Sequence, residues 1–168
     1  KHISLNKIPG DLVECGIFQG GNIILFKILA DEMGLGKSLQ ALACVELADY
    51  QHVLIVCPSI VKHNWANEIE KWIGTHCLTE ASMIKFASTE IIYGREGDIQ
   101  PARFHIINYD ILDARKEHLR AIGYDCIIFD EVHRIKDPKT ATTKASLYIG
   151  KNIDGIIALS GTPITNRP

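Results

Sequence analysis

The sequence lacks the features that mark membrane proteins, zinc-binding proteins and secreted proteins. No apolar run approaches the ~20 residues that a membrane-spanning helix needs, and no signal peptide is evident at the start of the chain. The five cysteines are scattered and no two of them form a Cys-x-x-Cys pair, which makes a zinc site an unfavoured interpretation. Their odd number and wide spacing favour reduced thiols, so we expect an intracellular protein with no membrane association.

The sequence also lacks a large excess of either charge. The chain has 18 Lys and Arg against 20 Asp and Glu, for a net charge of −2. Bulk charge therefore does not indicate a basic nucleic-acid-binding module, and any such binding must come from a local face. What is present is 46% hydrophobic residues over 168 positions, enough for one substantial core. We expect a single domain across residues 1–168.

Residues 28–40, ILADEMGLGKSLQ, have the pattern of a phosphate-binding loop. An apolar run over 23–29 predicts a strand, and apolar residues at helical intervals over 38–50 predict a helix. The loop between them carries Gly34 and Gly36, which allow the backbone to approach an anion closely. The N–H groups and the dipole at the start of the helix favour negative charge there.

Two side chains complete this cradle. Lys37 is suited to reach the β- and γ-phosphates of a nucleotide, and the hydroxyl of Ser38 is suited to ligate Mg²⁺. The alternative is a chance Gly-Lys-Ser tripeptide at a helix start. The strand, loop and helix in sequence favour the phosphate loop, with ATP and Mg²⁺ as the expected cofactors.

Residues 125–133, DCIIFDEVH, form a second chemical centre. The apolar stretch 126–129 predicts a buried strand near the middle of a sheet. Asp130 and Glu131 follow it directly, at the strand end where open parallel sheets bind ligands. Asp130 is suited to hold Mg²⁺ through water, and Glu131 is suited to polarise an attacking water.

Apolar strands alternate with helical segments along the rest of the chain. The strands are predicted at 53–57, 104–107 and 153–159, and the helices at 60–73, 111–122 and 138–148. This alternation predicts an α/β fold with a mainly parallel sheet and helices on both faces. Ser59, Asp110 and the Asp137-Pro138 pair are expected to set the helix starts. Trp65 and Trp72 are predicted to pack in the core.

Basic residues gather on the helix expected at 111–122. They are Arg115, Lys116, His118 and Arg120. We interpret this cluster as a solvated helix face.

Four motifs together resemble the Swi/Snf-type DNA translocases of helicase superfamily two. DEMGLGKS, with Asp31 where the general phosphate loop has its first glycine, is similar to the first motif of that family. DEVH resembles the Asp-Glu-x-His box of that family, and INYDIL resembles its short tyrosine-containing motif. SGTP resembles the motif that couples ATP state to the grip on DNA. The resemblance implies a RecA-like P-loop domain. It also implies the first ATP-binding lobe of a motor that tracks double-stranded DNA and needs a second RecA-like lobe, which this chain does not contain.

The resemblance also implies roles for individual residues. Nucleotide contacts fall on Asp31, Gly34, Leu35, Gly36, Lys37 and Ser38, with Gln19 as the reader of adenine. The expected catalytic residues are Glu131, Lys37 and Asp130, and the expected Mg²⁺-binding residues are Ser38 and Asp130. Coupling of ATP state to DNA falls on His133, Ser160 and Thr162. DNA contacts fall on Pro58, Ser59, Lys62, Asn108 and Tyr109.

Alternatives remain open at this point. One is an RNA helicase or a restriction-type translocase from the same superfamily, although DEMGLGK favours a protein that tracks duplex DNA. A non-hydrolysing ATP-binding scaffold would share the fold alone. Gln19 can equally be a solvated loop residue, and His133 a surface histidine. Because arginine fingers come from the second lobe, we expect this lobe by itself to hydrolyse ATP poorly.

Overall fold

The computed structural model of the protein describes residues 11–13, 25–30, 36–74 and 88–161. These residues form a seven-stranded sheet in the order β1-β2-β7-β6-β3-β5-β4. The strands are β1 (Asp11–Val13), β2 (Leu25–Ala30), β3 (Val53–Cys57), β4 (Thr89–Ile91), β5 (Phe104–Asn108), β6 (Cys126–Phe129) and β7 (Gly155–Ser160). All neighbouring strands pair in parallel except β1, which is antiparallel to β2. The predicted α/β fold with a mainly parallel sheet is confirmed, and β6 lies at its centre.

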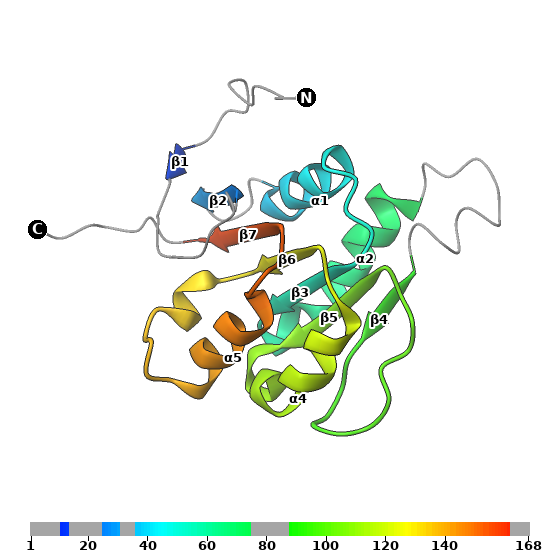
Figure 1. Ribbon diagram of the computed structural model, residues 1–168. Coiled ribbons are helices and arrows are strands. Elements are labelled where there is room, and N and C mark those ends of the chain that lie inside the picture. The colour runs from blue at the N-terminus through cyan, green and yellow to red at the C-terminus, as the bar shows by residue number, and fades with distance from the viewer. Residues whose placement is uncertain (1–10, 14–24, 31–35, 75–87, 162–168) are drawn as a thin grey trace, which may run out of the picture.

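Helices cover both faces of the sheet (Figure 1). They are α1 (Lys37–Leu47), α2 (Lys62–Trp72), α4 (Tyr109–Ile122) and α5 (Ala141–Gly150), with short 3₁₀ helices η1 (Ser59–Val61) and η3 (Val132–Ile135). Helices α1 and α2 pack on one face, and α4 and α5 pack on the other. Within the described part of the chain, no helix is long and apolar enough to cross a membrane.

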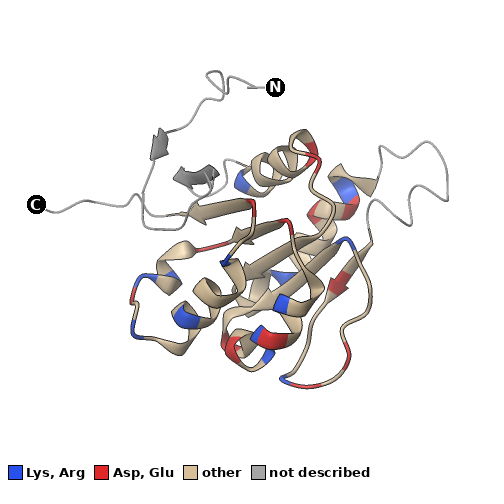
Figure 2. Cartoon of the chain, in the orientation of Figure 1, with Lys and Arg blue, Asp and Glu red and all other residues tan. Residues whose placement is uncertain are grey.

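The core consists of two layers of apolar side chains separated by the sheet. Alternate residues of β3 belong to different layers, because successive side chains of a strand point to opposite faces. Val53 and Ile55 pack with α1 and α2, whereas Leu54 and Val56 pack with α4 and α5. Strands β3, β5, β6 and β7 are buried on both faces and contain no Lys, Arg, Asp or Glu (Figure 2). This is the composition expected of parallel strands covered on both sides.

The three predicted helix starts are wrong in position. Ser59 does not cap a long helix; it begins η1, and α2 begins at Lys62 without a side-chain cap. Asp110 lies inside the first turn of α4, where its Oδ2 accepts a hydrogen bond from Asn108 Nδ2. At α5, Asp137 instead accepts from the N–H of Lys139 in a local turn. The helix begins after Thr140, whose hydroxyl accepts from the N–H of Thr143.

The interpretation of the basic cluster on α4 as a solvated face is wrong for Arg115. Its side chain is 2% exposed and donates to the backbone carbonyls of Tyr93, Gly94, Glu96 and Gly97. A guanidinium carries five N–H donors in a fixed fork, so one side chain can satisfy several carbonyls of a tight loop. Arg115 therefore holds the loop between β4 and β5 against α4. Lys116, by contrast, makes an exposed ion pair with Asp113.

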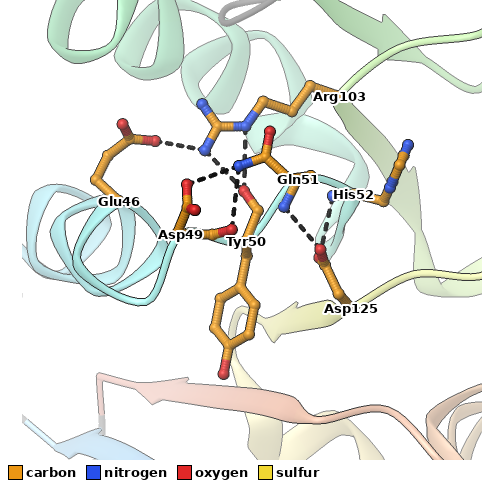
Figure 3. A network of polar contacts seen from close by, with 7 residues as sticks. All are labelled: Glu46, Asp49, Tyr50, Gln51, His52, Arg103 and Asp125. Atoms are coloured by element: carbon orange, nitrogen blue, oxygen red, sulfur yellow. Dashed lines mark hydrogen bonds and ion pairs between the residues drawn. The ribbon is translucent and has the colours of Figure 1, made fainter. Parts of the chain in front are cut away.

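A polar network ties the end of α1 to the amino-terminal edge of the sheet (Figure 3). Arg103 donates to Glu46 Oε1 at 2.6 Å and to the Tyr50 carbonyl at 2.8 Å. Asp125 accepts from the N–H groups of Gln51 and His52 at 2.7 and 3.0 Å. Since Arg103 precedes β5 and Asp125 precedes β6, the network fixes α1 to two strand starts.

We predict that Arg103→Met lowers the free energy of unfolding by about 2–4 kcal/mol, because it strips the Tyr50 carbonyl of its guanidinium donor and removes the charge partner of Glu46. Guanidinium denaturation followed by circular dichroism measures this. The matched control is Lys116→Met, which breaks an exposed ion pair and should leave the free energy unchanged within experimental error. Equal losses in the two variants would show that the network does not hold α1.

Candidate nucleotide-binding site

Three motif-bearing segments leave the sheet at one edge. Strands β2, β7 and β6 are neighbours, and all three are parallel. In the register of the sheet Ala30 pairs with Ser160, and Phe129 pairs with Ala158. The carboxyl ends of these strands therefore lie side by side. This is the edge at which open α/β sheets bind ligands.

Helix α1 begins at this edge directly after a glycine in the left-handed region. Gly36 has φ 74°, a conformation that favours glycine, and Lys37 is the first residue of the helix. The first helical hydrogen bond runs from the N–H of Gln40 to the Gly36 carbonyl at 3.0 Å. The first turn of an α-helix presents backbone N–H groups and positive dipole charge to an anion. The start of α1 thus has the geometry of an anion site.

A cavity of about 430 Å³ lies between the start of α1 and the polar face of α2. Its described lining residues are Gly36, Lys37, Ser38, Asn64, Asn67 and Glu68. The three residues from α2 were not among those predicted. Their spacing of i, i+3 and i+4 places them on one helix face, beside the apolar face of Trp65 and Ile69. That periodicity is the signal by which the sequence could have indicated them.

Asp130 is held on several sides at the end of β6. Its Oδ2 accepts a hydrogen bond from Trp65 Nε1 at 2.9 Å, and its backbone N–H donates to the Val56 carbonyl at 2.8 Å. Its backbone carbonyl accepts from the Tyr109 hydroxyl at 2.7 Å. Burial raises the pKa of the Asp130 carboxyl, while the hydrogen bond from Trp65 and the charge of Lys37 act in the opposite direction. Asp130 thus follows β6 at the same edge of the sheet as the end of β2, the strand that leads to α1 and Lys37.

Glu131 has a more open position than Asp130. Its backbone is left-handed, with φ 55°, and it precedes η3. Its Oε2 lies 3.2 Å from Nδ1 of His133, and the side chains of Glu131 and His133 are 32% and 50% exposed. The carboxylate of Glu131 therefore remains accessible to water, beside a histidine from the next turn.

Residues 24–168 match the family model described as the SNF2-related domain. The chain belongs to the SNF2-related domain family. The resemblance to Swi/Snf-type proteins is thereby confirmed.

Relatives and a solved structure agree with this assignment. The chain is 36% identical over 145 residues to the SWI/SNF-related matrix-associated actin-dependent regulator of chromatin subfamily A-like protein 1 of Xenopus laevis, covering 84% of this chain and 14% of that protein. It is 32% identical over 167 residues to the human DNA repair and recombination protein RAD54B, covering 92% of this chain and 18% of that protein. The chain thus spans less than a fifth of the length of these curated relatives.

The solved structure is the Sulfolobus solfataricus SWI2/SNF2 ATPase core in complex with dsDNA. It matches with a TM-score of 0.67 and 29% sequence identity, covering 83% of this chain and 28% of that chain. This confirms the RecA-like fold expected of a SNF2-related domain.

The residues expected to contact DNA in this SNF2-related domain lie at the ends of β3 and β5. Pro58 and Ser59 follow β3, and Ser59 is exposed. Lys62 is only 6% exposed, and its Nζ donates to Asn108 Oδ1 and to the Ile92 carbonyl, both at 3.2 Å. The same ammonium lies 4.3 Å from the centroid of the Tyr93 ring, and burial lowers the pKa of Lys62. The fold therefore brings Lys62 and Asn108 together, and their side chains form a hydrogen bond with each other.

Of the remaining predicted site residues, five lie outside the described residues and Ser160 lies within them. Gln19, Asp31, Gly34, Leu35 and Thr162 lie outside the described residues. Ser160, the last residue of β7, is buried at the edge beside Ala30.

The donor chemistry at this edge fits a magnesium ion. Ser38 supplies a hydroxyl and Asp130 a carboxylate, and Mg²⁺ prefers oxygen ligands while keeping several waters and substrate phosphates. Among the residues that the structure describes, no group of three or more His, Cys, Asp and Glu side chains could hold a metal ion. A cation at this site would thus draw most of its ligands from nucleotide and water.

We predict that Tyr109→Phe lowers the free energy of unfolding by about 1–2 kcal/mol, because it leaves the partly buried Asp130 carbonyl without the donor at 2.7 Å. Thermal or urea denaturation measures this. Tyr124→Phe is the matched control: its hydroxyl is also buried but has no hydrogen-bond partner among the described residues, so its removal should be neutral or stabilising. A neutral Tyr109→Phe would mean that its hydroxyl does not anchor Asp130.

Proposed function

We propose that this chain is the first RecA-like lobe of an ATP-dependent translocase of double-stranded DNA. One observation carries the proposal: β2, which leads to Lys37 at the start of α1, and β6, which leads to Asp130 and Glu131, end on either side of β7 at one edge of the parallel sheet. A phosphate-binding lysine and a metal-binding carboxylate can then serve one nucleotide. Membership of the SNF2-related domain family supports the same function.

The phosphate-binding side of the site consists of α1 and the loop before it. The backbone at Gly36 and the first turn of α1 would bind phosphate oxygens, and Lys37 would neutralise the β- and γ-phosphates. The preceding loop, with Asp31, Gly34 and Leu35, would complete the cradle, and Gln19 would read the adenine edge.

The reaction proposed is hydrolysis of the terminal phosphoanhydride bond. Ser38 and Asp130 would hold Mg²⁺, which when bound supplies positive charge against the phosphate oxygens. Glu131 would orient a water molecule and take its proton as the water oxygen bonds to the γ-phosphorus. The bond from that phosphorus to the β–γ bridging oxygen breaks, and ADP leaves with phosphate. The exposure of the Glu131 carboxylate suits this role.

The chain would work together with a second RecA-like lobe. Phosphoryl transfer depends mainly on positioning and on charge stabilisation, and an arginine finger contributes on the order of 10³–10⁵ in rate. We propose that the second lobe supplies it. His133, Ser160 and Thr162 would couple the nucleotide state to movement between the lobes.

Double-stranded DNA is the proposed polymer substrate. The related Sulfolobus solfataricus ATPase core is a complex with dsDNA, and the human relative is a DNA repair and recombination protein. In this chain Pro58 and Ser59 would contact the backbone of one strand. The DNA-contacting segments would be completed by Lys62, Asn108 and Tyr109. The hydrogen bond from Lys62 to Asn108 would hold together the ends of β3 and β5, from which these contacts are made. Because DNA is found inside cells, this proposed substrate is consistent with an intracellular location of the protein.

The direct test is Lys37→Ala in the protein at its natural length. Titration calorimetry with Mg²⁺ and a non-hydrolysable ATP analogue should show affinity reduced by at least about 10-fold, because the lysine charge no longer meets the phosphates. The control is Lys144→Ala, an exposed lysine of α5 on the other face of the sheet. Unchanged affinity in the Lys37 variant would contradict the cradle.

The same preparation separates hydrolysis from binding. Glu131→Gln should bind the analogue normally yet lose duplex-stimulated ATP hydrolysis by roughly 10²-fold or more. Binding without measurable hydrolysis in both the unmodified protein and this variant would favour a non-hydrolysing scaffold. Hydrolysis that is equally fast in both would show that Glu131 does not activate the water. Stronger stimulation by RNA than by duplex DNA would favour an RNA helicase.

A further inference from the structure

Trp65 makes a contact that core packing does not require. The residue lies in α2, is 2% exposed, and packs with the apolar layer under α1 and α2. A buried indole still needs an acceptor for its N–H. Here the acceptor is Oδ2 of Asp130, at 2.9 Å, which is 65 residues away in sequence. The ring therefore joins the core to the edge of the sheet where the nucleotide would bind.

The hydrogen bond restricts the orientation of the Asp130 carboxylate. An aspartate carboxyl rotates broadly about its last torsion when nothing holds it. The rigid indole fixes Oδ2, so the direction of Oδ1 is fixed as well. The backbone of Asp130 cannot turn to compensate, because its N–H binds the Val56 carbonyl and its own carbonyl binds the Tyr109 hydroxyl.

The chemistry of the donor suits a carboxylate that must bind a cation. An indole N–H is neutral, so it orients Asp130 without cancelling the negative charge. A lysine or arginine in its place would compete with the metal for that charge. Partners that orient a metal-binding carboxylate in this way commonly change metal affinity 10–100-fold when removed.

We infer that Trp65 is a positioning residue for magnesium binding, acting by holding one oxygen of Asp130 so that the other is directed at the metal. This inference depends on the proposed function, because Asp130 is taken as the magnesium-binding carboxylate. Trp65 itself touches neither the nucleotide nor the metal in this account.

The chain contains a matched comparison in Trp72. Trp72 lies on the same helix, and its Nε1 also donates to a carboxylate, Glu68 Oε2, at 2.7 Å. That bond spans only four residues within α2 and orients Glu68, a carboxylate that lines the cavity but is not taken as a magnesium ligand. A Trp→Phe change at either position removes one indole N–H from one carboxylate.

The test uses the protein at its natural length and a non-hydrolysable ATP analogue. Its affinity is measured by calorimetry across a magnesium titration and again in EDTA. For Trp65→Phe, the Mg²⁺ concentration that gives half-maximal enhancement of binding should rise by about 10-fold or more, while affinity in EDTA stays unchanged. Trp72→Phe should leave that Mg²⁺ concentration unchanged, because the carboxylate that Trp72 orients is not the one taken to bind the metal.

A second variant removes the donor without leaving a void. It replaces the Trp65 side chain by a benzothiophene analogue, in which sulfur stands where the indole has its N–H. The shape and packing persist, so a shifted magnesium requirement would support positioning by the hydrogen bond. A magnesium requirement equal to that of the unmodified protein would overturn the inference, whatever happens to Trp65→Phe.

Asp130→Asn distinguishes failure of the inference from failure of the proposed function. If this variant weakens the dependence on magnesium but the benzothiophene variant does not, Trp65 only packs and the inference is wrong. If Asp130→Asn also leaves the magnesium dependence unchanged, Asp130 does not hold the metal, and the proposed site itself is wrong.

Discussion

The parallel pairing of β2, β7, β6 and β3 is the constraint on which the site depends. It brings the carboxyl ends of strands that are far apart in sequence to one edge. For β3, β6 and β7 the pairing is specified by burial on both faces, since nearly every residue of these three strands is apolar and two helical layers cover them. The chemistry at the edge is thus a consequence of which residues follow each buried strand.

Asp130 lies at the boundary between the apolar core and the carboxyl edge of the sheet. It sits at the end of the central strand, half within the apolar layers, and burial raises its pKa. Three hydrogen bonds, to Val56, Trp65 and Tyr109, offset the cost of that position. Each partner lies on a different element, so the sheet and both helical layers fix the residue, and the bond from Trp65 is made to the carboxylate itself. The opposite edge has its own network around Arg103 and Asp125, which fixes the other end of α1 (Figure 3).

Much of the fold was predictable because burial leaves a periodic signal in the sequence. The apolar runs at 53–57 and 126–129 correspond to β3 and β6 without change. The end of β2 at the same edge as the end of β6 was predictable as well, because both are strands of one parallel sheet. Helix starts were less predictable, since Asp137 and Thr140 are both good capping residues and only the folded turn selects Thr140.

The partners of polar side chains were the least predictable part of the site. Arg115 has the local sequence of an exposed residue, yet its fork meets carbonyls of a loop about 20 positions earlier. Trp65 was predicted to pack in the core and does so, but its hydrogen bond to Asp130 depends on the packing of α2 against the sheet. Such contacts follow from tertiary placement, which periodicity does not encode.

The central claim is that the start of α1 and the end of β6 bind one metal–nucleotide complex. Replacing magnesium by paramagnetic Mn²⁺ with a non-hydrolysable ATP analogue tests this most directly, through the relaxation of assigned backbone amide signals. We expect the largest relaxation enhancements at both Gly36 to Ser38 and Asp130 to Glu131, and much smaller ones at Arg103 and Asp125 on the opposite edge. Strong enhancement at only one of the two groups, or at the opposite edge, would contradict the central claim.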